Sequence, residues 1–211
     1  RWAVRKAIDA RKQRMKILLA GEGPDDIGDW SAEIEYRPTA ESFKRGVVEV
    51  LLGRLAPESW RVANGVRWKK IRKYRSGEHR KPETRNVQGL ALQASEAGYG
   101  AVVFSRDRDR SVQREKDIVA GIEQSQRFGV RVLGGCAVEE LEAWILALLG
   151  VAHSESSADA KARLRDEHGI AGREQMVEVV EAADLDSAAI DAGSLRVWMN
   201  QIRSAVAELP E

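Results

Sequence analysis

The stretch AVVFSRDRDR, residues 101–110, is the part of the sequence that decides the fold class. Its first four residues are all apolar, which is typical of a strand buried on both faces of a parallel sheet. Two aspartates, Asp107 and Asp109, follow where such a strand would end. Because helices cover the faces of parallel sheets, this stretch predicts an α/β fold, provided that helical and strand-like patterns alternate around it.

That alternation is present on both sides of the stretch. An apolar run, KILLA, ends in Gly-Glu-Gly-Pro and predicts a buried strand that enters a tight loop. The other strands that we expect are residues 59–66, which are less regular, and 130–133. Helical spacing of apolar residues covers 39–55, with Thr39 as N-cap, and also 86–97, 112–128 and 139–150. We therefore predict a mostly parallel sheet flanked by helices.

The ends of the chain differ from this central part. Residues 1–14 are basic and helix-prone, and Met15 immediately precedes the first strand, so we interpret 1–14 as a leader or upstream extension. After residue 150 the stretch HSESSADA resembles a linker, and only helical patterns follow it. We predict a sheet domain at 15–150 and a helical C-terminal appendage at 151–211.

Length and composition limit the class of protein. A chain of 211 residues can bury a core without covalent cross-links, and its single cysteine, Cys136, excludes an intramolecular disulfide. No run approaches the ~20 apolar residues that cross a bilayer. These features indicate a soluble, cytoplasmic protein.

Charge is distributed unevenly along the chain. Residues 139–211 hold 15 Asp+Glu against 6 Lys+Arg, a net charge of −9, which leaves +10 for residues 1–138. Residues 67–85 hold nine Lys/Arg against two Glu, and Trp68 and Tyr74 lie among the cations. This pattern suits nucleic-acid binding through phosphate contacts and base or sugar stacking, and it fits equally well a solvated loop whose two aromatic rings are anchored in the core. The candidate binding residues are Lys69, Lys70, Arg72, Lys73 and Arg75.

Acidic residues follow three of the expected strands. The carboxyl ends of parallel strands meet at one edge of a sheet, and that edge usually carries the functional site. A D-x-D pair in extended backbone points both carboxylates the same way, and magnesium prefers such hard oxygen ligands. The sequence therefore predicts a magnesium site from the acids Glu22, Asp26, Asp107 and Asp109 and a glutamate among Glu139, Glu140 and Glu142.

Three stretches resemble the acidic motifs of the Toprim fold: GEGPDD at 21–26, FSRDRD at 104–109 and EELEAW at 139–144. The resemblance covers about residues 15–150 and is closest to small bacterial Toprim proteins related to the nuclease domain of overcoming-lysogenization-defect proteins. The matching residues are Glu22 and Asp26, Asp107 and Asp109, and Glu140 and Glu142. Two features depart from the pattern: Asp26 replaces a more usual glutamate, and the arginines Arg106, Arg108 and Arg110 surround the aspartates.

The resemblance implies a nuclease that uses Mg²⁺ or Mn²⁺, with DNA favoured over RNA, and with Glu22, Asp107 and Asp109 as catalytic residues. One ion would be held by Glu22, Asp107 and Asp109, and a second by Asp26 and a glutamate of the 139–142 group. Glu22 is alternatively the general base. The resemblance also implies an ATPase partner in bacterial defence against phage, which the acidic C-terminal helices would contact.

Three other interpretations remain at this level. Each acidic motif taken alone also fits a solvated loop or an ordinary helix N-terminus. AVVFSRDRDRS loosely resembles the D-x-D-x-[ST] motif of haloacid-dehalogenase-like phosphatases, although that interpretation assigns no role to Glu22. The third interpretation is a non-catalytic module that keeps the fold and uses the basic segment to bind nucleic acid. Nucleic-acid binding that persists without magnesium, together with no cleavage products in any metal, would distinguish this module from a nuclease.

Overall fold

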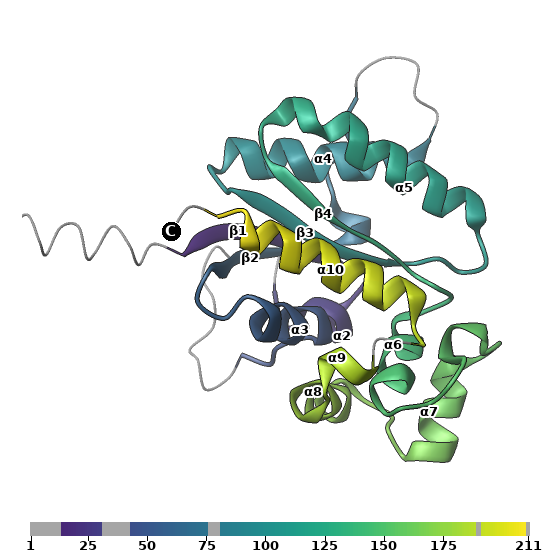
Figure 1. Cartoon of the computed structure of the whole chain (residues 1–211). Coiled ribbons are helices and arrows are strands. Elements are labelled where there is room, and N and C mark those ends of the chain that lie inside the picture. The colour runs from purple at the N-terminus through teal and green to yellow at the C-terminus, as the bar shows by residue number, and fades with distance from the viewer. Residues whose placement is uncertain (1–13, 31–42, 76–80, 189–190, 210–211) are drawn as a thin grey trace, which may run out of the picture.

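The computed structural model describes residues 14–30, 43–75, 81–188 and 191–209, so the expected leader lies almost wholly outside the described residues. Four parallel strands form one sheet in the order β2-β1-β3-β4. The strands are β1 (Met15–Gly21), β2 (Trp60–Arg67), β3 (Ala101–Asp107) and β4 (Arg131–Ala137). All four expected strands are thus confirmed, and the predicted parallel α/β sheet is confirmed with them (Figure 1).

The two central strands are buried on both faces because their side chains are apolar at successive positions. In β1, Ile17 and Leu19 face one core, while Leu18 and Ala20 face the other. β3 continues the pattern and extends past its apolar run to Asp107. The strand therefore delivers the first acid of the D-x-D pair directly to the edge of the sheet.

Helices cover both faces of the sheet, as Figure 1 shows. On one face lie α4 (Pro82–Glu96) and α5 (Val112–Ser125), which pack on each other and on the smaller core. On the other face lie α3 (Val47–Leu55), α6 (Leu141–Leu148) and α10 (Gly193–Ala207). Within the described part of the chain, no helix is long and apolar enough to cross a membrane.

Two of the expected helices begin later than their patterns indicated. The helix expected at 39–55 begins at Val47 after Gly46, and the proposed cap Thr39 lies outside the described residues. A side chain at Gly46 would approach the carbonyl oxygen of Asp26 to 2.4 Å, because the chain passes directly over the short helix α2 (Pro24–Ile27) at this point. The helix expected at 139–150 begins at Leu141.

The C-terminal segment is helical, as expected. It contains α7 (Ala160–His168), α8 (Arg173–Ala182), α9 (Leu185–Ala188) and α10, preceded by a 3-10 turn at Ser154–Ser156. Trp198 of α10 is buried, its indole N–H donates a 2.9 Å hydrogen bond to the carbonyl oxygen of Phe104 in β3, and its ring centroid lies 5.7 Å from that of Trp144. The boundary near residue 150 stays a prediction; helices on both sides of it pack into one core with the sheet.

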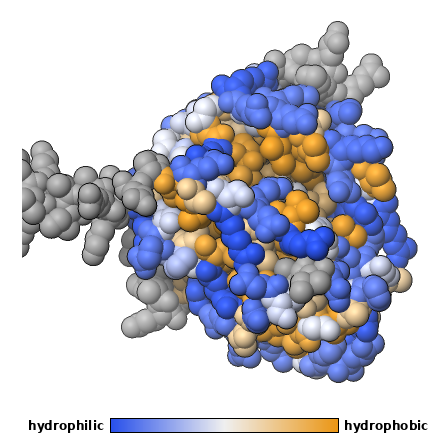
Figure 2. All heavy atoms as spheres, in the orientation of Figure 1, coloured by the Kyte–Doolittle hydropathy of each residue, from blue (hydrophilic) through white to orange (hydrophobic). Residues whose placement is uncertain are grey.

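β4 is an edge strand, and its outer side lies between α5 and α10. Figure 2 shows apolar surface gathered on this face. The exposed valines Val119 and Val197 line a cavity here together with residues of β4. The backbone N–H of Gly134 donates a 2.9 Å hydrogen bond to the side-chain oxygen of Gln201. A side chain of α10 therefore satisfies one backbone donor of this open edge.

Candidate metal centre

Carboxylates from three parts of the chain meet at the carboxyl edge of the sheet. The turn after β1 supplies Glu22 and Asp26, β3 ends at Asp107, and the first turn of α6 supplies Glu142. The backbone N–H of Asp107 donates a 3.2 Å hydrogen bond to Glu22 Oε1, and the N–H of Leu141 donates one of 3.0 Å to Asp107 Oδ1. These bonds connect the three acidic motifs to one another.

Asp26 is a buried carboxylate. Its Oδ2 accepts hydrogen bonds from the backbone N–H groups of Glu22 and Gly23, because the chain turns tightly into α2. Burial, with smaller contributions from the charges of Glu142 and Asp25, raises the pKa of Asp26 to about 7 despite the opposing effect of the Gly23 hydrogen bond.

Asp107 and Glu142 share this environment. Burial raises the pKa of Asp107 to about 7, and the charges of Asp26, Glu142 and Asp109 contribute in the same direction. Burial also raises the pKa of Glu142, against a partial offset from Lys161, whose Nζ lies 3.7 Å from Glu142 Oε1. Such mutual repulsion among carboxylates favours protons or a cation between them.

Among the three glutamates near the start of α6, the structure brings Glu142 to Asp26 and Asp107. Glu139 has a positive φ of 64° and forms ion pairs with Arg108 and, at 3.9 Å, with Arg110. Glu140 is the N-cap residue, and its Oε1 accepts a 2.7 Å hydrogen bond from the backbone N–H of Lys161. Both Glu139 and Glu140 are therefore engaged with other groups.

The geometry that we expected for the D-x-D pair is wrong at its second residue. β3 ends at Asp107, and the following Asp109 and Arg110 have φ values of 46° and 60°, so the backbone is no longer extended. The Asp109 carboxylate pairs with Arg114 and lies 4.0 Å from Arg106. Asp109 contributes charge to the site, while its carboxylate is bound to arginine.

Glu83 and Arg114, which the sequence did not point to, complete the ion-pair network around Glu22 and Asp109. Arg106 pairs with Glu22 and lies 3.5 Å from Glu83 Oε1, and Arg114 lies 3.4 Å from the same oxygen. Glu83 also accepts a 2.7 Å hydrogen bond from the indole of Trp68. Neither Glu83 nor Arg114 belongs to an acidic motif, and no spacing in the sequence would have connected them to Glu22.

The carboxylates of this site fit a divalent cation in their chemistry, although they do not yet surround one point. Among the described residues, no group of three or more His, Cys, Asp or Glu side chains already converges on one point. The described ion pairs engage Glu22, Asp109 and Glu142, and none of them engages Asp26 or Asp107. Magnesium keeps several waters and needs only one or two carboxylates, so the buried Asp26 and the partly buried Asp107, which form none of the described ion pairs, fit it chemically.

The basic segment combines exposed cations with packed aromatic rings. The expected binding residues Lys69, Lys70, Arg72, Lys73 and Arg75 are all exposed. Trp68 is only 6% exposed, and its ring centroid lies 5.4 Å from that of Phe104. The expectation that Trp68 stacks on bases is therefore wrong, because the ring anchors this segment in the core.

The chain was compared with models of protein families, with curated proteins and with solved structures, and none of them matches. The functional argument therefore depends on the acidic motifs and on the geometry described above.

Proposed function

We propose that this chain is a Toprim-type, metal-dependent phosphodiesterase that hydrolyses nucleic acid, with DNA favoured. The observation that carries the proposal is the grouping of Asp26, Asp107 and Glu142 at the carboxyl edge of the sheet. Asp26 is buried and the other two are partly buried, and burial, with a smaller contribution from neighbouring carboxylate charges, raises the pKa of all three. A cation offsets this repulsion, and a phosphodiester substrate supplies further oxygen ligands.

Asp26, Asp107 and Glu142 would hold Mg²⁺ or Mn²⁺. The ion would supply a Lewis acid and a bound water of lowered pKa. Glu22 is the candidate general base or a further ligand, and it hydrogen-bonds the backbone of Asp107. Binding of a second ion would require Glu22 and Asp109 to exchange their arginine partners for metal.

Arg106 and Arg114 are the candidate residues for binding substrate phosphate. Both guanidinium groups lie beside the carboxylates and share Glu83 as a counter-ion. Guanidinium groups bind phosphate oxygens in a bidentate manner and stabilise the charge of a phosphoryl transition state. The same two groups form ion pairs with Glu22 and Asp109.

The wider setting is proposed by analogy with the resemblance. It consists of an ATPase partner and a role in defence against phage, with the acidic C-terminal helices as the contact surface. Co-expression with a neighbouring ATPase and measurement of the mass of the purified complex would test the partner. Removal of surface acids from α8, such as Glu178, should weaken that complex.

The enzymatic proposal is tested by cleavage of supercoiled plasmid in Mg²⁺ or Mn²⁺. Asp107→Asn keeps the shape of the side chain and removes its charge, so it should abolish metal-dependent cleavage while the fold is retained. Asp166→Asn is the matched control, since Asp166 is an exposed acid that pairs with Arg165 on α7. Full cleavage by Asp107→Asn would contradict the assignment of the site.

The non-catalytic nucleic-acid-binding module remains the second candidate, and the exposed cations of residues 69–75 favour it. It predicts binding that persists in chelator and no products in any divalent metal. If the protein binds metal clearly but cleaves nothing, the assignment of the carboxylate site stands, and the binding module is favoured over the nuclease. None of the contacts described above favours a haloacid-dehalogenase-like phosphatase.

A further inference from the structure

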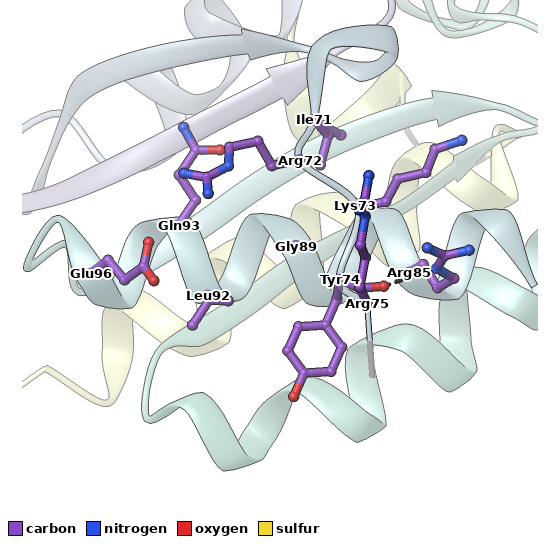
Figure 3. A pocket seen from close by; sticks show the side chains of 10 residues that line it. All are labelled: Ile71, Arg72, Lys73, Tyr74, Arg75, Arg85, Gly89, Leu92, Gln93 and Glu96. Carbon is purple, nitrogen blue, oxygen red and sulfur yellow. Dashed lines mark hydrogen bonds between the residues drawn. The ribbon is translucent and has the colours of Figure 1, made fainter. Parts of the chain in front are cut away.

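A basic cavity lies on α4, outside the carboxylate site (Figure 3). Its volume is about 740 Å³. The segment after β2 forms one wall and α4 forms the other. The charged and polar residues that line it are Arg72, Lys73, Tyr74, Arg75, Arg85, Gln93 and Glu96. We call this cavity the α4 groove. It contains four cations and a single acid, so an anion is the ligand that its charge fits.

The groove exists because the chain crosses α4 at a glycine. A side chain at Gly89 would approach the carbonyl oxygen of Arg72 to 2.2 Å, so only glycine allows the segment to lie this close to the helix. Arg85 then fixes the next residues, since its Nε donates a 2.8 Å hydrogen bond to the carbonyl oxygen of Tyr74. The cations of the segment are thereby held along one side of α4.

The shape of the groove favours a long anion over a small one. From Arg85 to Glu96, α4 extends roughly 16 Å at its usual rise per residue. Duplex DNA carries one negative charge per ~1.7 Å of its axis, so a phosphate backbone can meet several of these cations at once. A ligand with one phosphate would leave most of them without a partner.

The two aromatic rings of the basic segment both contact other side chains, and one of them, Tyr74, also lines the groove. Trp68 is buried against Phe104. The ring of Tyr74 packs edge-on against Phe128 at a centroid distance of 5.4 Å, and the guanidinium of Arg127 lies 5.0 Å from the Tyr74 ring centroid. Proteins that bind single strands combine a basic groove with free stacking rings, and this groove has only the first of these features.

We propose that the α4 groove binds the phosphate backbone of a nucleic-acid duplex and stacks none of its bases. This inference rests on the proposed function in that nucleic acid is the substrate.

The test measures binding without cleavage. A labelled duplex of about 20 base pairs and one of its strands are titrated with protein in chelator, by fluorescence anisotropy, between about 50 and 200 mM salt. The groove variant combines Arg72→Gln, Lys73→Gln and Arg75→Gln. The matched control combines Arg163→Gln, Arg165→Gln and Arg203→Gln. These three cations lie on α7 and α10, away from the groove, and each forms an ion pair with an acid.

We expect the parent to bind the duplex more tightly than the single strand, with little dependence on base sequence. The groove variant should lower the slope of log K against log salt by about 0.9 for each lost contact and weaken duplex binding about tenfold or more at low salt. The control should keep the parental slope. Arg85→Gln, with its fold checked by circular dichroism, should lower the slope by about one contact.

Two results would overturn this inference: a parental slope in the groove variant, or single-strand binding equal to duplex binding. Each is independent of catalysis. If the protein binds duplex through the groove and cleaves nothing, this inference stands and the proposed nuclease activity is wrong. If the protein cleaves DNA and the groove variant keeps the parental salt slope, the proposed nuclease activity stands and this inference is wrong.

Discussion

The backbone N–H of Asp107 donates a 3.2 Å hydrogen bond to the side chain of Glu22, so the last residue of β3 holds the first acid that follows β1. Neighbouring parallel strands do not need this bond, because their backbone groups already pair with each other. It fixes the Glu22 carboxylate at the edge of the sheet, beside Arg106. The position of Glu22 is therefore set both by the end of β3 and by an arginine.

The first prediction concerns pH and the stability of the metal-free protein. Asp26 and Asp107 have pKa values raised to about 7 in the folded state, against ~3.9 for an unfolded aspartate. A group of this kind contributes stability that is fully present below the unfolded pKa and is lost as pH rises through the folded pKa. In chelator, Tm should therefore fall between about pH 4 and pH 7 from these two groups.

Measurement of Tm across this pH range checks the prediction. Asp107→Asn should flatten the fall, since it removes one of the two titrating groups. Added Mg²⁺ should raise Tm more at the alkaline end than at the acidic end, because protons and metal compete for the same carboxylates. Parallel curves for parent and variant would show that Asp107 ionises normally.

The second prediction separates the glutamates near the start of α6. Glu142 is coupled to Asp26 and Asp107, whereas Glu140 accepts a hydrogen bond from the backbone of Lys161. Glu142→Gln should reduce the rise in Tm that Mg²⁺ gives the parent, and Glu140→Gln should retain it. The two substitutions remove the same charge two residues apart, so each is the control for the other. The opposite result would assign the ligand to Glu140.

The third prediction concerns the C-terminal helices. Trp198→Ala should destabilise the protein by about 3–5 kcal/mol, because it leaves a large cavity and removes the hydrogen bond to Phe104. Trp198→Phe keeps most of the ring and should cost less. Urea unfolding of the parent should show a single transition, and both variants should shift it. A second transition that Trp198→Ala leaves unchanged would show that the sheet domain folds independently, as the boundary near residue 150 predicts.

The elements of the fold could be predicted from sequence because their signals are local. The apolar runs of β1 and β3 specify buried strands, and the acids that follow them reach one edge of a parallel sheet by topology alone. The directions in which the side chains point, and the partners that they bind, depend on tertiary contacts instead. Asp109 turns away because its φ is positive and Arg114 binds it, and Arg114 comes from the first turn of α5.

The start of α6 shows the same limit. The sequence presents Glu139, Glu140 and Glu142 as near equivalents, and their periodicity suggests one helix. The positive φ of Glu139 and the cap at Glu140 delay the helix to Leu141 and separate the three roles. These conformations depend on pairing with Arg108 and on the chain near Lys161, which lies 21 residues away from Glu140.

The last prediction separates the two possible roles of Glu22. Burial and Arg114 lower the pKa of Arg106, while the charges of Asp109 and Asp107 raise it, so Arg106 lies within the field of the candidate centre. Arg106→Gln removes a positive charge there and releases Glu22 from its ion pair. Metal binding should tighten by on the order of 1 kcal/mol, or about fivefold, for a nearby charge at an effective dielectric constant of ~20 after solvent screening.

A double-mutant cycle with Glu22→Gln then reads out the role of Glu22, with Mg²⁺ affinity measured by titration of Tm and cleavage measured in parallel. If Glu22 is a ligand, Glu22→Gln should weaken metal binding more in the Arg106→Gln background than in the parent, because the released carboxylate is then free to coordinate. If Glu22 is the general base, metal affinity should be nearly unchanged in both backgrounds while the cleavage rate falls. We expect Arg106→Gln alone to bind metal more tightly and to cleave more slowly, since it improves the cation site and removes a guanidinium that would face the phosphate. Unchanged metal affinity in Arg106→Gln would place the cation beyond the reach of this arginine, and it would remove Glu22 from the metal site.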